Sequence, residues 1–210
     1  MATTITKTTA TAPPPPPPHC RESDLVELIH LDSTFKLDVR YATTNNFTGH
    51  QIYDEPRCFL QRPAAEALVR VHQALKGEGY GLVLFDGYRP WSATKLFYDI
   101  TPDHQKIFVA DPAVGSRHNR GCAIDLSLFD LETGENVEMP SAFDEMTERA
   151  FVTYQGGTEK QRVARDLLRT YMQANGQFFV YPEEWWHWDF KDYHAYAVQN
   201  ISFSEIKSCI

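Results

Sequence analysis

The sequence lacks long apolar runs, an excess of basic residues and any paired cysteine motif. No stretch approaches the roughly 20 apolar residues of a membrane-spanning helix, so no membrane partner is expected. Lys and Arg total 20 against 28 Asp and Glu, and the net charge of −8 argues against a nucleic-acid groove. The four cysteines contain no C-x-x-C pair, which speaks against a thiolate zinc site and a disulfide framework alike.

The N-terminal segment differs in composition from the rest of the chain. Residues 1–18 are rich in Thr and Ala, end in six consecutive prolines and lack the apolar core of a secretory signal. We therefore expect residues 1–23 to form a disordered, polyproline-type tail on a cytoplasmic protein. Residues 24–210 are expected to form one domain, because 210 residues suffice for one sizeable core and are too few for two.

Apolar patterning in that domain predicts both strands and helices, in irregular order. Alternating or continuous apolar residues predict strands at 35–40, 81–86, 122–128, 178–181 and 186–190. Helical spacing predicts helices at 63–76, 91–98 and 159–175. Thr158 and Gly176 would begin and end the last of these. The irregular order favours an α+β class over a doubly wound sheet.

Two short segments contain side chains suited to a catalytic metal. Residues 116–125 read S-x-H-x-x-G-x-A-x-D, and residues 184–187 read E-x-x-H. Catalytic zinc needs three N or O ligands from the protein and an open fourth position. His118, Asp125 and His187 could supply those ligands.

Glu184 is the remaining carboxylate of the two motifs. It lies three residues before His187, so on a regular strand the two side chains would face opposite ways. Both can reach one metal only if Glu184 lies in a bend, for which Pro182 is suitably placed. There Glu184 could take a proton from metal-bound water and pass it to the leaving amine. Tryptophans of this segment are expected to wall the site: Trp185, Trp186 and Trp188.

Each of these residues, taken singly, also has an ordinary structural interpretation. A His or Asp on an amphipathic strand is more often a surface residue or a hydrogen-bonded one. Spacing alone therefore leaves both a metal site and a set of structural polar residues open.

The motifs taken together indicate a family. S-R-H-N-R-G-x-A-I-D-L, F-D-E-M and E-W-W-H, preceded by D-G-Y-R-P, resemble the VanX-type D-alanyl-D-alanine dipeptidases of the wider zinc D-Ala-D-Ala peptidase group. The likeness extends from about residue 32 to residue 189 and keeps the order of the motifs. It implies hydrolysis of the small D,D-dipeptide D-alanyl-D-alanine to two D-alanines, with one Zn²⁺ per subunit.

The resemblance also implies roles for individual residues. Zinc ligands fall on His118, Asp125 and His187, and the general base and acid falls on Glu184. The arginine that stabilises the transition state falls on Arg89, for which a structural ion pair at a strand end is the alternative.

Three further positions match expected substrate contacts. Asp144 corresponds to the carboxylate that holds the free ammonium group, which would explain selectivity for a dipeptide. It could instead cap the helix-like stretch that follows. Tyr41 and Ser116 match polar residues expected at the substrate ends, although Ser116 could merely bond a backbone group.

The predicted fold is a single α+β domain with a central, mainly antiparallel sheet flanked by helices, and with zinc at the sheet edge or in a cleft. Two other functions stay open. One is a zinc D,D-carboxypeptidase or endopeptidase acting on cell-wall peptides, and the other is a non-catalytic zinc-binding module. The connection from Arg89 to His118 looks shorter than in the VanX enzyme, which bears on substrate preference more than on chemistry.

Overall fold

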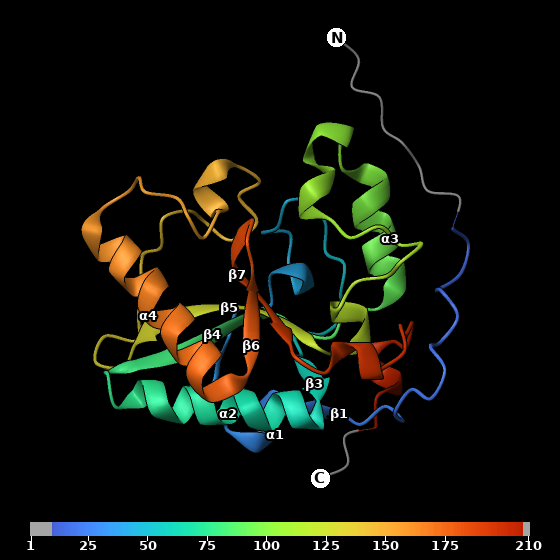
Figure 1. Cartoon of the computed structure of the whole chain (residues 1–210), viewed down its shortest axis with the longest axis horizontal. Coiled ribbons are helices and arrows are strands. Elements are labelled where there is room, and N and C mark those ends of the chain that lie inside the picture. Colours follow the sequence, from blue (N-terminus) through green and yellow to red (C-terminus); the bar gives the residue numbers. More distant parts are fainter. Residues whose placement is uncertain (1–9, 208–210) are drawn as a thin grey trace.

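A five-stranded sheet with strand order β2-β4-β5-β7-β6 forms the centre of the molecule (Figure 1). The computed structural model describes residues 10–207. The β2–β4 pair is parallel, and the β4–β5, β5–β7 and β6–β7 pairs are antiparallel. The strands are β2 (Lys36–Leu37), β4 (Tyr80–Asp86), β5 (Ala123–Asp130), β6 (Phe178–Tyr181) and β7 (Glu184–Phe190). This arrangement confirms the predicted α+β class with a mainly antiparallel sheet.

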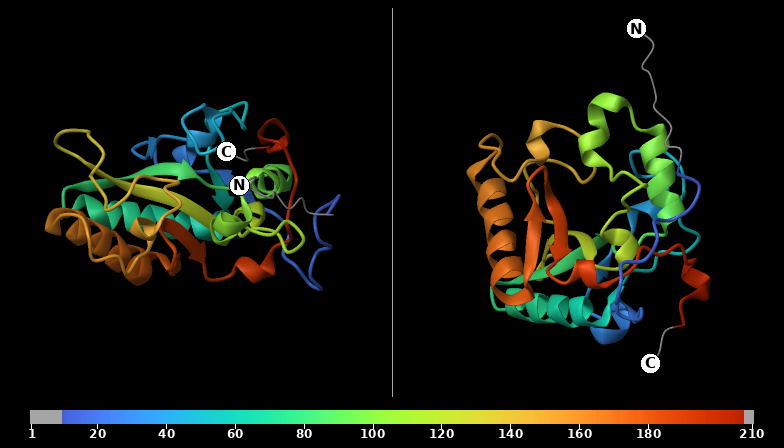
Figure 2. Two further views of the ribbon diagram at one scale, coloured as in Figure 1. Left: turned by 90° about the horizontal axis from the view of Figure 1, so that it is seen from above. Right: turned by 45° about the vertical axis from the view of Figure 1, so that its right-hand side comes forward.

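Helices α2 (Arg62–Lys76) and α4 (Glu159–Gly176) pack against each other and cover one face of the sheet. The view from above in Figure 2 has these two helices on one side of the strands and the segment from about residue 32 to residue 58 on the other. Proline in the first turn begins α2, and Thr158 begins α4 through a capping box with Gln161. Both helices lie close to their predicted positions.

The remaining elements are short and lie around this core. Strands β1 (Leu25–Glu27) and β3 (Phe59–Gln61) form a separate antiparallel pair beside helix α1 (Leu28–Leu31). Helix α3 (Trp91–Ile100) follows β4 and stands at the side of the sheet (Figure 1). Of the described residues, none belongs to a helix long and apolar enough to cross a membrane.

The end of α4 differs from the prediction. Gly176 is the last helical residue, and the left-handed conformation belongs to Gln177, whose φ is 59°. A Cβ on Gly176 would lie 2.5 Å from the Phe178 ring and 2.7 Å from Val71. The glycine is therefore needed for close packing between α4, α2 and β6, and not for its backbone freedom.

The predicted strand at 35–40 is also shorter than expected. Only Lys36–Leu37 pairs with β4, and the chain then turns into a 3-10 helix at Arg40–Ala42. This turn buries Tyr41, which is 2% exposed, in the core. The disorder predicted for residues 1–23 stays a prediction, and residues 1–9 lie outside the described part of the chain.

Candidate active site

Three neighbouring strands bring acidic and imidazole side chains into one row. Asp125 on β5 is the register partner of His187 on β7 and also of Asp86 at the end of β4. An irregularity between Leu84 and Asp86 shifts the β4–β5 register, so that the two aspartates become neighbours. The row lies at the central strands of the sheet rather than at an edge strand.

His118 reaches this row from a 3-10 turn, His118–Arg120, that precedes β5. Gly121 ends the turn with a φ of 66°, and a Cβ there would lie 2.4 Å from Leu25. The chain therefore reverses at Gly121, and the position requires glycine both for its backbone conformation and for its small size. It folds the chain back so that His118 faces Asp125, which follows it by seven residues.

The three predicted metal ligands converge on one point. His118 Nε2 lies 3.3 Å from Asp125 Oδ1 and 3.1 Å from His187 Nδ1. His187 Nδ1 lies 3.0 Å from the same Asp125 oxygen. All three side chains are buried, and their candidate ligand atoms lie within 4.8 Å of one another.

In each histidine, the hydrogen bond made by the ring nitrogen that faces away from Asp125 determines whether the other nitrogen is free to bind a cation. His118 Nδ1 lies 2.7 Å from the carbonyl oxygen of Gly87, and His187 Nε2 lies 3.0 Å from Asp189 Oδ1. Both oxygens can only accept, so each of these nitrogens donates its hydrogen. In neutral rings this leaves His118 Nε2 and His187 Nδ1 as bare acceptors that face a carboxylate oxygen. Such converging acceptors attract a cation, either a proton on one of the rings or a metal ion, and two imidazoles with one carboxylate suit zinc.

The charges of this cluster stabilise the ionised form of Asp125. Although burial alone would raise the pKa of Asp125, the charges and hydrogen bonds that His118 and His187 supply when their rings are protonated lower it well below its usual value. Asp125 therefore remains a carboxylate, as a metal ligand must.

Glu184 lies beside the cluster at the start of β7. Its Oε2 is 3.7 Å from His187 Nδ1, and its side chain is 13% exposed. The β6–β7 register shifts between Val180 and Tyr181, which breaks the strict alternation of β7 and brings Glu184 to the side of His187. Burial raises the pKa of Glu184 to about 8, with added repulsion from Asp125 and Asp144. The bend expected before this strand thus takes the form of a register shift within its pairing.

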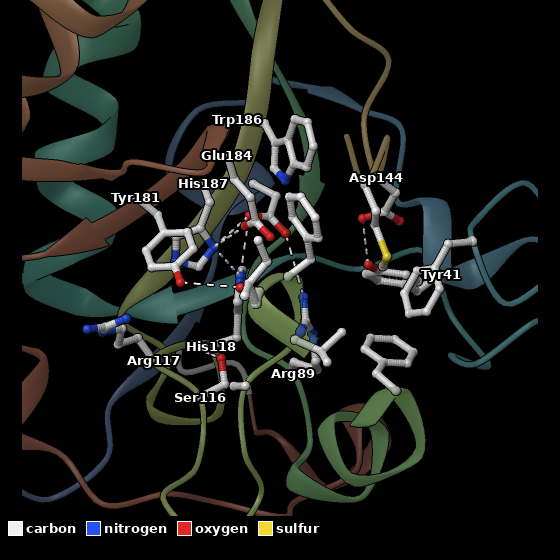
Figure 3. A pocket seen from close by; sticks show the side chains of 18 of the residues that line it. Tyr41, Arg89, Ser116, Arg117, His118, Asp144, Tyr181, Glu184, Trp186 and His187 are labelled. Atoms are coloured by element: carbon white, nitrogen blue, oxygen red, sulfur yellow. Dashed lines mark hydrogen bonds and ion pairs between the residues drawn. The ribbon is translucent and has the colours of Figure 1, made fainter. Parts of the chain in front are cut away.

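Arg89 is fixed at the other side of the cluster by Asp86. Its Nε and Nη2 each lie 2.8 Å from Asp86 Oδ2, while Nη2 is 3.6 Å from Asp125 Oδ2. Tyr53 donates a hydrogen bond of 2.9 Å to the second oxygen of Asp86. The structural ion pair considered as the alternative role is therefore present, and it also directs the guanidinium toward the cluster (Figure 3).

Asp144 and Tyr41 lie together on one side of the cleft (Figure 3). The Tyr41 hydroxyl donates a hydrogen bond of 3.1 Å to Asp144 Oδ1. Asp144 Oδ2 is buried and has no hydrogen-bond partner among the described residues. Burial, together with the nearby Asp125, raises the pKa of Asp144 to about 7. Its φ is 61°, and the following 3-10 helix is capped by Thr147, so Asp144 does not act as that cap.

Ser116 contacts the backbone of the histidine turn. Its hydroxyl oxygen accepts a hydrogen bond of 3.2 Å from the His118 N–H, and the residue also lines the cleft. The backbone role considered for Ser116 is thus present, and its hydroxyl hydrogen is not used in this bond.

The cleft that contains these residues is small and partly apolar, with a volume of about 130 Å³. Aromatic side chains from four separate segments contribute to its wall: Phe47, Phe97, Phe108 and Trp186. Only one of the three tryptophans expected there lines it. Trp185 is turned toward Ser141, to which it donates a hydrogen bond of 2.8 Å, and Trp188 is buried away from the cleft.

Comparison with known proteins agrees with this geometry. The model of the D-Ala-D-Ala dipeptidase family, peptidase family M15, matches residues 21–206. The chain belongs to this family. As an M15 family member, the protein is a peptidase.

Several related proteins are similar over most of the chain. The D-alanyl-D-alanine dipeptidase of Escherichia coli (strain K12) is 36% identical over 185 residues, which is 87% of this chain and 94% of that protein. The enzymes of that name from Enterococcus faecium and Enterococcus faecalis are 37% and 36% identical, and each alignment covers 80% of this chain and 90% of the relative. Among solved structures, the LdcB LD-carboxypeptidase aligns with a TM-score of 0.37 and 22% identity over 71% of this chain and 70% of its own.

Two residues of this M15 site were not assigned a role from the sequence. Asp86 belongs to the D-G-Y-R-P motif, and its position three residues before Arg89 could have suggested the ion pair. Asp189 follows His187 by two residues, and on a strand such residues share a face. The pattern H-x-D at the end of a predicted strand was therefore the available signal.

Proposed function

We propose that this protein hydrolyses free D-alanyl-D-alanine to two D-alanines, with one Zn²⁺ held by His118, Asp125 and His187. The observation that carries the proposal is the convergence of three ligand atoms within 4.8 Å, beside a glutamate whose side chain is only 13% exposed. Membership of the M15 peptidase family supports the same reaction.

The donor set fits zinc because it combines two imidazole nitrogens and one carboxylate oxygen. When bound, the metal supplies a Lewis acid that polarises the amide carbonyl and lowers the pKa of the attacking water. The positive charge of such an ion would also favour the ionised form of Glu184, whose pKa burial otherwise raises to about 8.

Glu184 is the residue proposed to move the proton. Its carboxylate takes a proton from the attacking water and later donates that proton to the leaving amine. Its place beside His187, at 3.7 Å, keeps it next to the metal ligands without making it one of them. A non-catalytic zinc module would have no use for such a base.

Arg89 is proposed to stabilise the negative charge that develops on the carbonyl oxygen. The guanidinium is 10% exposed and is already held by Asp86, so little reorganisation is needed when charge appears. Its contact with Asp125, at 3.6 Å, keeps it at the side of the ligand cluster.

The substrate ends are proposed to contact Asp144, Tyr41 and Ser116. Asp144 Oδ2 lacks a partner among the described residues, so a substrate ammonium group would supply one. Tyr41 holds the other oxygen of Asp144 in place. The Ser116 hydroxyl hydrogen is available for the other end of the dipeptide, and the cleft of about 130 Å³ suits a short ligand.

The decisive assay compares three substrates with and without a chelator: D-Ala-D-Ala, N-acetyl-D-Ala-D-Ala and L-Ala-L-Ala. We expect chelator-sensitive turnover of D-Ala-D-Ala and rejection of the N-acetylated compound, because acetylation removes the ammonium charge that Asp144 would hold. Comparable turnover of the N-acetylated compound would show that the protein is a D,D-carboxypeptidase instead. Zinc binding without turnover of any substrate would show that it is a non-catalytic zinc-binding module. The cytoplasmic location stays a prediction, which cell fractionation would test.

A further inference from the structure

Asp189 lies on the side of the His187 ring that faces away from the ligand cluster. It is two residues further along β7, so the pleat turns both side chains to the same face of the sheet. Asp189 Oδ1 is 3.0 Å from His187 Nε2, and the residue is 8% exposed. His187 Nδ1 points the other way, toward Asp125 at 3.0 Å.

The second oxygen of this carboxylate is held by Arg117. Arg117 Nε lies 3.3 Å from Asp189 Oδ2, and its guanidinium also stacks over the Tyr193 ring at 4.9 Å. Arg117 directly precedes His118, so the turn that delivers one proposed ligand also delivers the group that anchors the carboxylate behind the other. Each oxygen of Asp189 thus has a cationic or hydrogen-bonding partner.

The two histidines of the cluster are oriented by different kinds of group. His118 is oriented by the backbone carbonyl of Gly87, whereas His187 depends on a side chain, Asp189. A carboxylate that accepts from Nε2 fixes the tautomer with Nδ1 bare, prevents rotation of the ring and makes Nδ1 a stronger electron donor. Nothing else among the described residues is seen to accept a hydrogen bond from His187 Nε2.

We propose that Asp189, anchored by Arg117, is a positioning residue that orients His187 for metal binding. The inference rests on the proposed function in that the cluster must hold a divalent metal. It predicts that removal of the carboxylate weakens zinc binding although no ligand is lost. Arg117 acts on His187 only through Asp189, so its removal should weaken zinc binding less than removal of Asp189 does.

The test is the zinc dissociation constant, measured by competition with a chromophoric chelator on the full chain. Asp189→Ala should bind zinc roughly 10- to 100-fold more weakly than the wild type. Asp189→Asn keeps an oxygen acceptor of the same shape but loses the charge, so its loss should be intermediate. Arg117→Ala should lose less affinity than Asp189→Ala. Asp192→Ala is the matched control, because it removes a carboxylate three residues away that pairs with Arg21 at the surface.

Unfolding of each zinc-free variant, followed alongside, separates positioning from a purely structural role. A structural role would lower the stability of the zinc-free protein and leave the affinity of the folded protein unchanged. Zinc affinity of folded Asp189→Ala equal to that of Asp192→Ala would overturn the inference. If the alanine variant does not fold, Asp189→Asn decides in the same way. Failure of the wild type itself to bind zinc would refute the proposed function instead.

Discussion

The chemistry of the site at the residue scale depends on which nitrogen of each imidazole carries the hydrogen. On the outer side, the Gly87 carbonyl accepts a hydrogen bond from His118 and the Asp189 carboxylate accepts one from His187. The inner nitrogens are then left as acceptors next to Asp125. A metal ion could bind all three of these acceptors at once, whereas a proton on one ring can bridge only two of them, so the arrangement suits a metal.

Glu184→Gln should separate proton transfer from metal binding. The amide has the same shape but cannot accept the proton, so kcat for D-Ala-D-Ala should fall roughly 10²- to 10⁴-fold. The zinc content should stay at that of the wild type, because Glu184 is not a proposed ligand. Steady-state kinetics and metal analysis check both parts, with Glu183→Gln as the neighbouring control. Wild-type kcat in the Glu184 variant would refute its role as the base.

Asp144→Asn tests recognition of the substrate ammonium group. Loss of a charge-assisted hydrogen bond costs about 1.5–3 kcal/mol, so kcat/KM for the dipeptide should fall by roughly one to two orders of magnitude. Discrimination against the N-acetylated compound should shrink at the same time. Glu148→Gln, on the exposed turn that follows, serves as the control. Unchanged discrimination in the Asp144 variant would place the ammonium contact elsewhere.

At the scale of elements, the register of neighbouring strands positions the site. Irregular pairing between β4 and β5 makes Asp86 a neighbour of Asp125, and irregular pairing between β6 and β7 brings Glu184 to His187. The motifs placed Asp125, Glu184 and His187 in one candidate site but assigned no role to Asp86. They could not predict how these side chains meet, because a shift of one residue in pairing changes which face every later side chain occupies.

The end of α4 gives an element-scale prediction about stability. Gln177 holds a left-handed conformation at φ 59°, which costs a residue with a Cβ roughly 1–2 kcal/mol. The side chain is exposed, so Gln177→Gly should raise the free energy of unfolding by about 0.5–1 kcal/mol, part of the gain being offset by the freer unfolded chain. Gly176→Ala should lower it, because the new Cβ would meet Phe178 and Val71. Urea denaturation checks both, and equal stability of the Gln177→Gly variant and the wild type would contradict this account of the helix end.

The whole molecule brings four distant parts of the chain to one cleft. The loop with Tyr41, the turn with His118, the long connection with Asp144 and the last strand pair with His187 all contribute to its lining. Helix positions and the central strands could be predicted from apolar spacing and capping residues. The shapes of the loops could not, because backbone turns such as the one at Asp144, with φ 61°, depend on tertiary packing.

A buried histidine far from the cleft gives the whole molecule a predictable response to acid. His72 is fully buried, accepts a hydrogen bond of 3.1 Å from the Leu82 N–H and lies 2.9 Å from the Thr34 hydroxyl. Burial, helped by the charge of Lys76, lowers the pKa of His72 to about 4 in the folded protein, from 6.5. The unfolded chain therefore binds more protons between those values, and stability falls as the pH drops from about 6.5 toward 4.

His72→Gln should remove this part of the pH dependence. The wild type should lose up to roughly 1.4 kcal/mol per pH unit from His72 below pH 6.5, and the difference between wild type and variant should shrink as the pH falls. Denaturant unfolding of both proteins at several pH values measures this pH dependence. Subtracting the free energy of unfolding of the variant from that of the wild type cancels the contributions of the other titrating groups. Parallel pH profiles for the two proteins would contradict a neutral His72 in the folded state.

The central claim is that His118, Asp125 and His187 bind one divalent metal ion together. The most direct measurement is anomalous X-ray scattering at the zinc edge from crystals of the zinc-loaded protein. We predict a single strong peak among His118 Nε2, Asp125 Oδ1 and His187 Nδ1, and its loss in His118→Ala. A zinc-loaded crystal with no peak at that point, or with zinc bound elsewhere, would contradict the account.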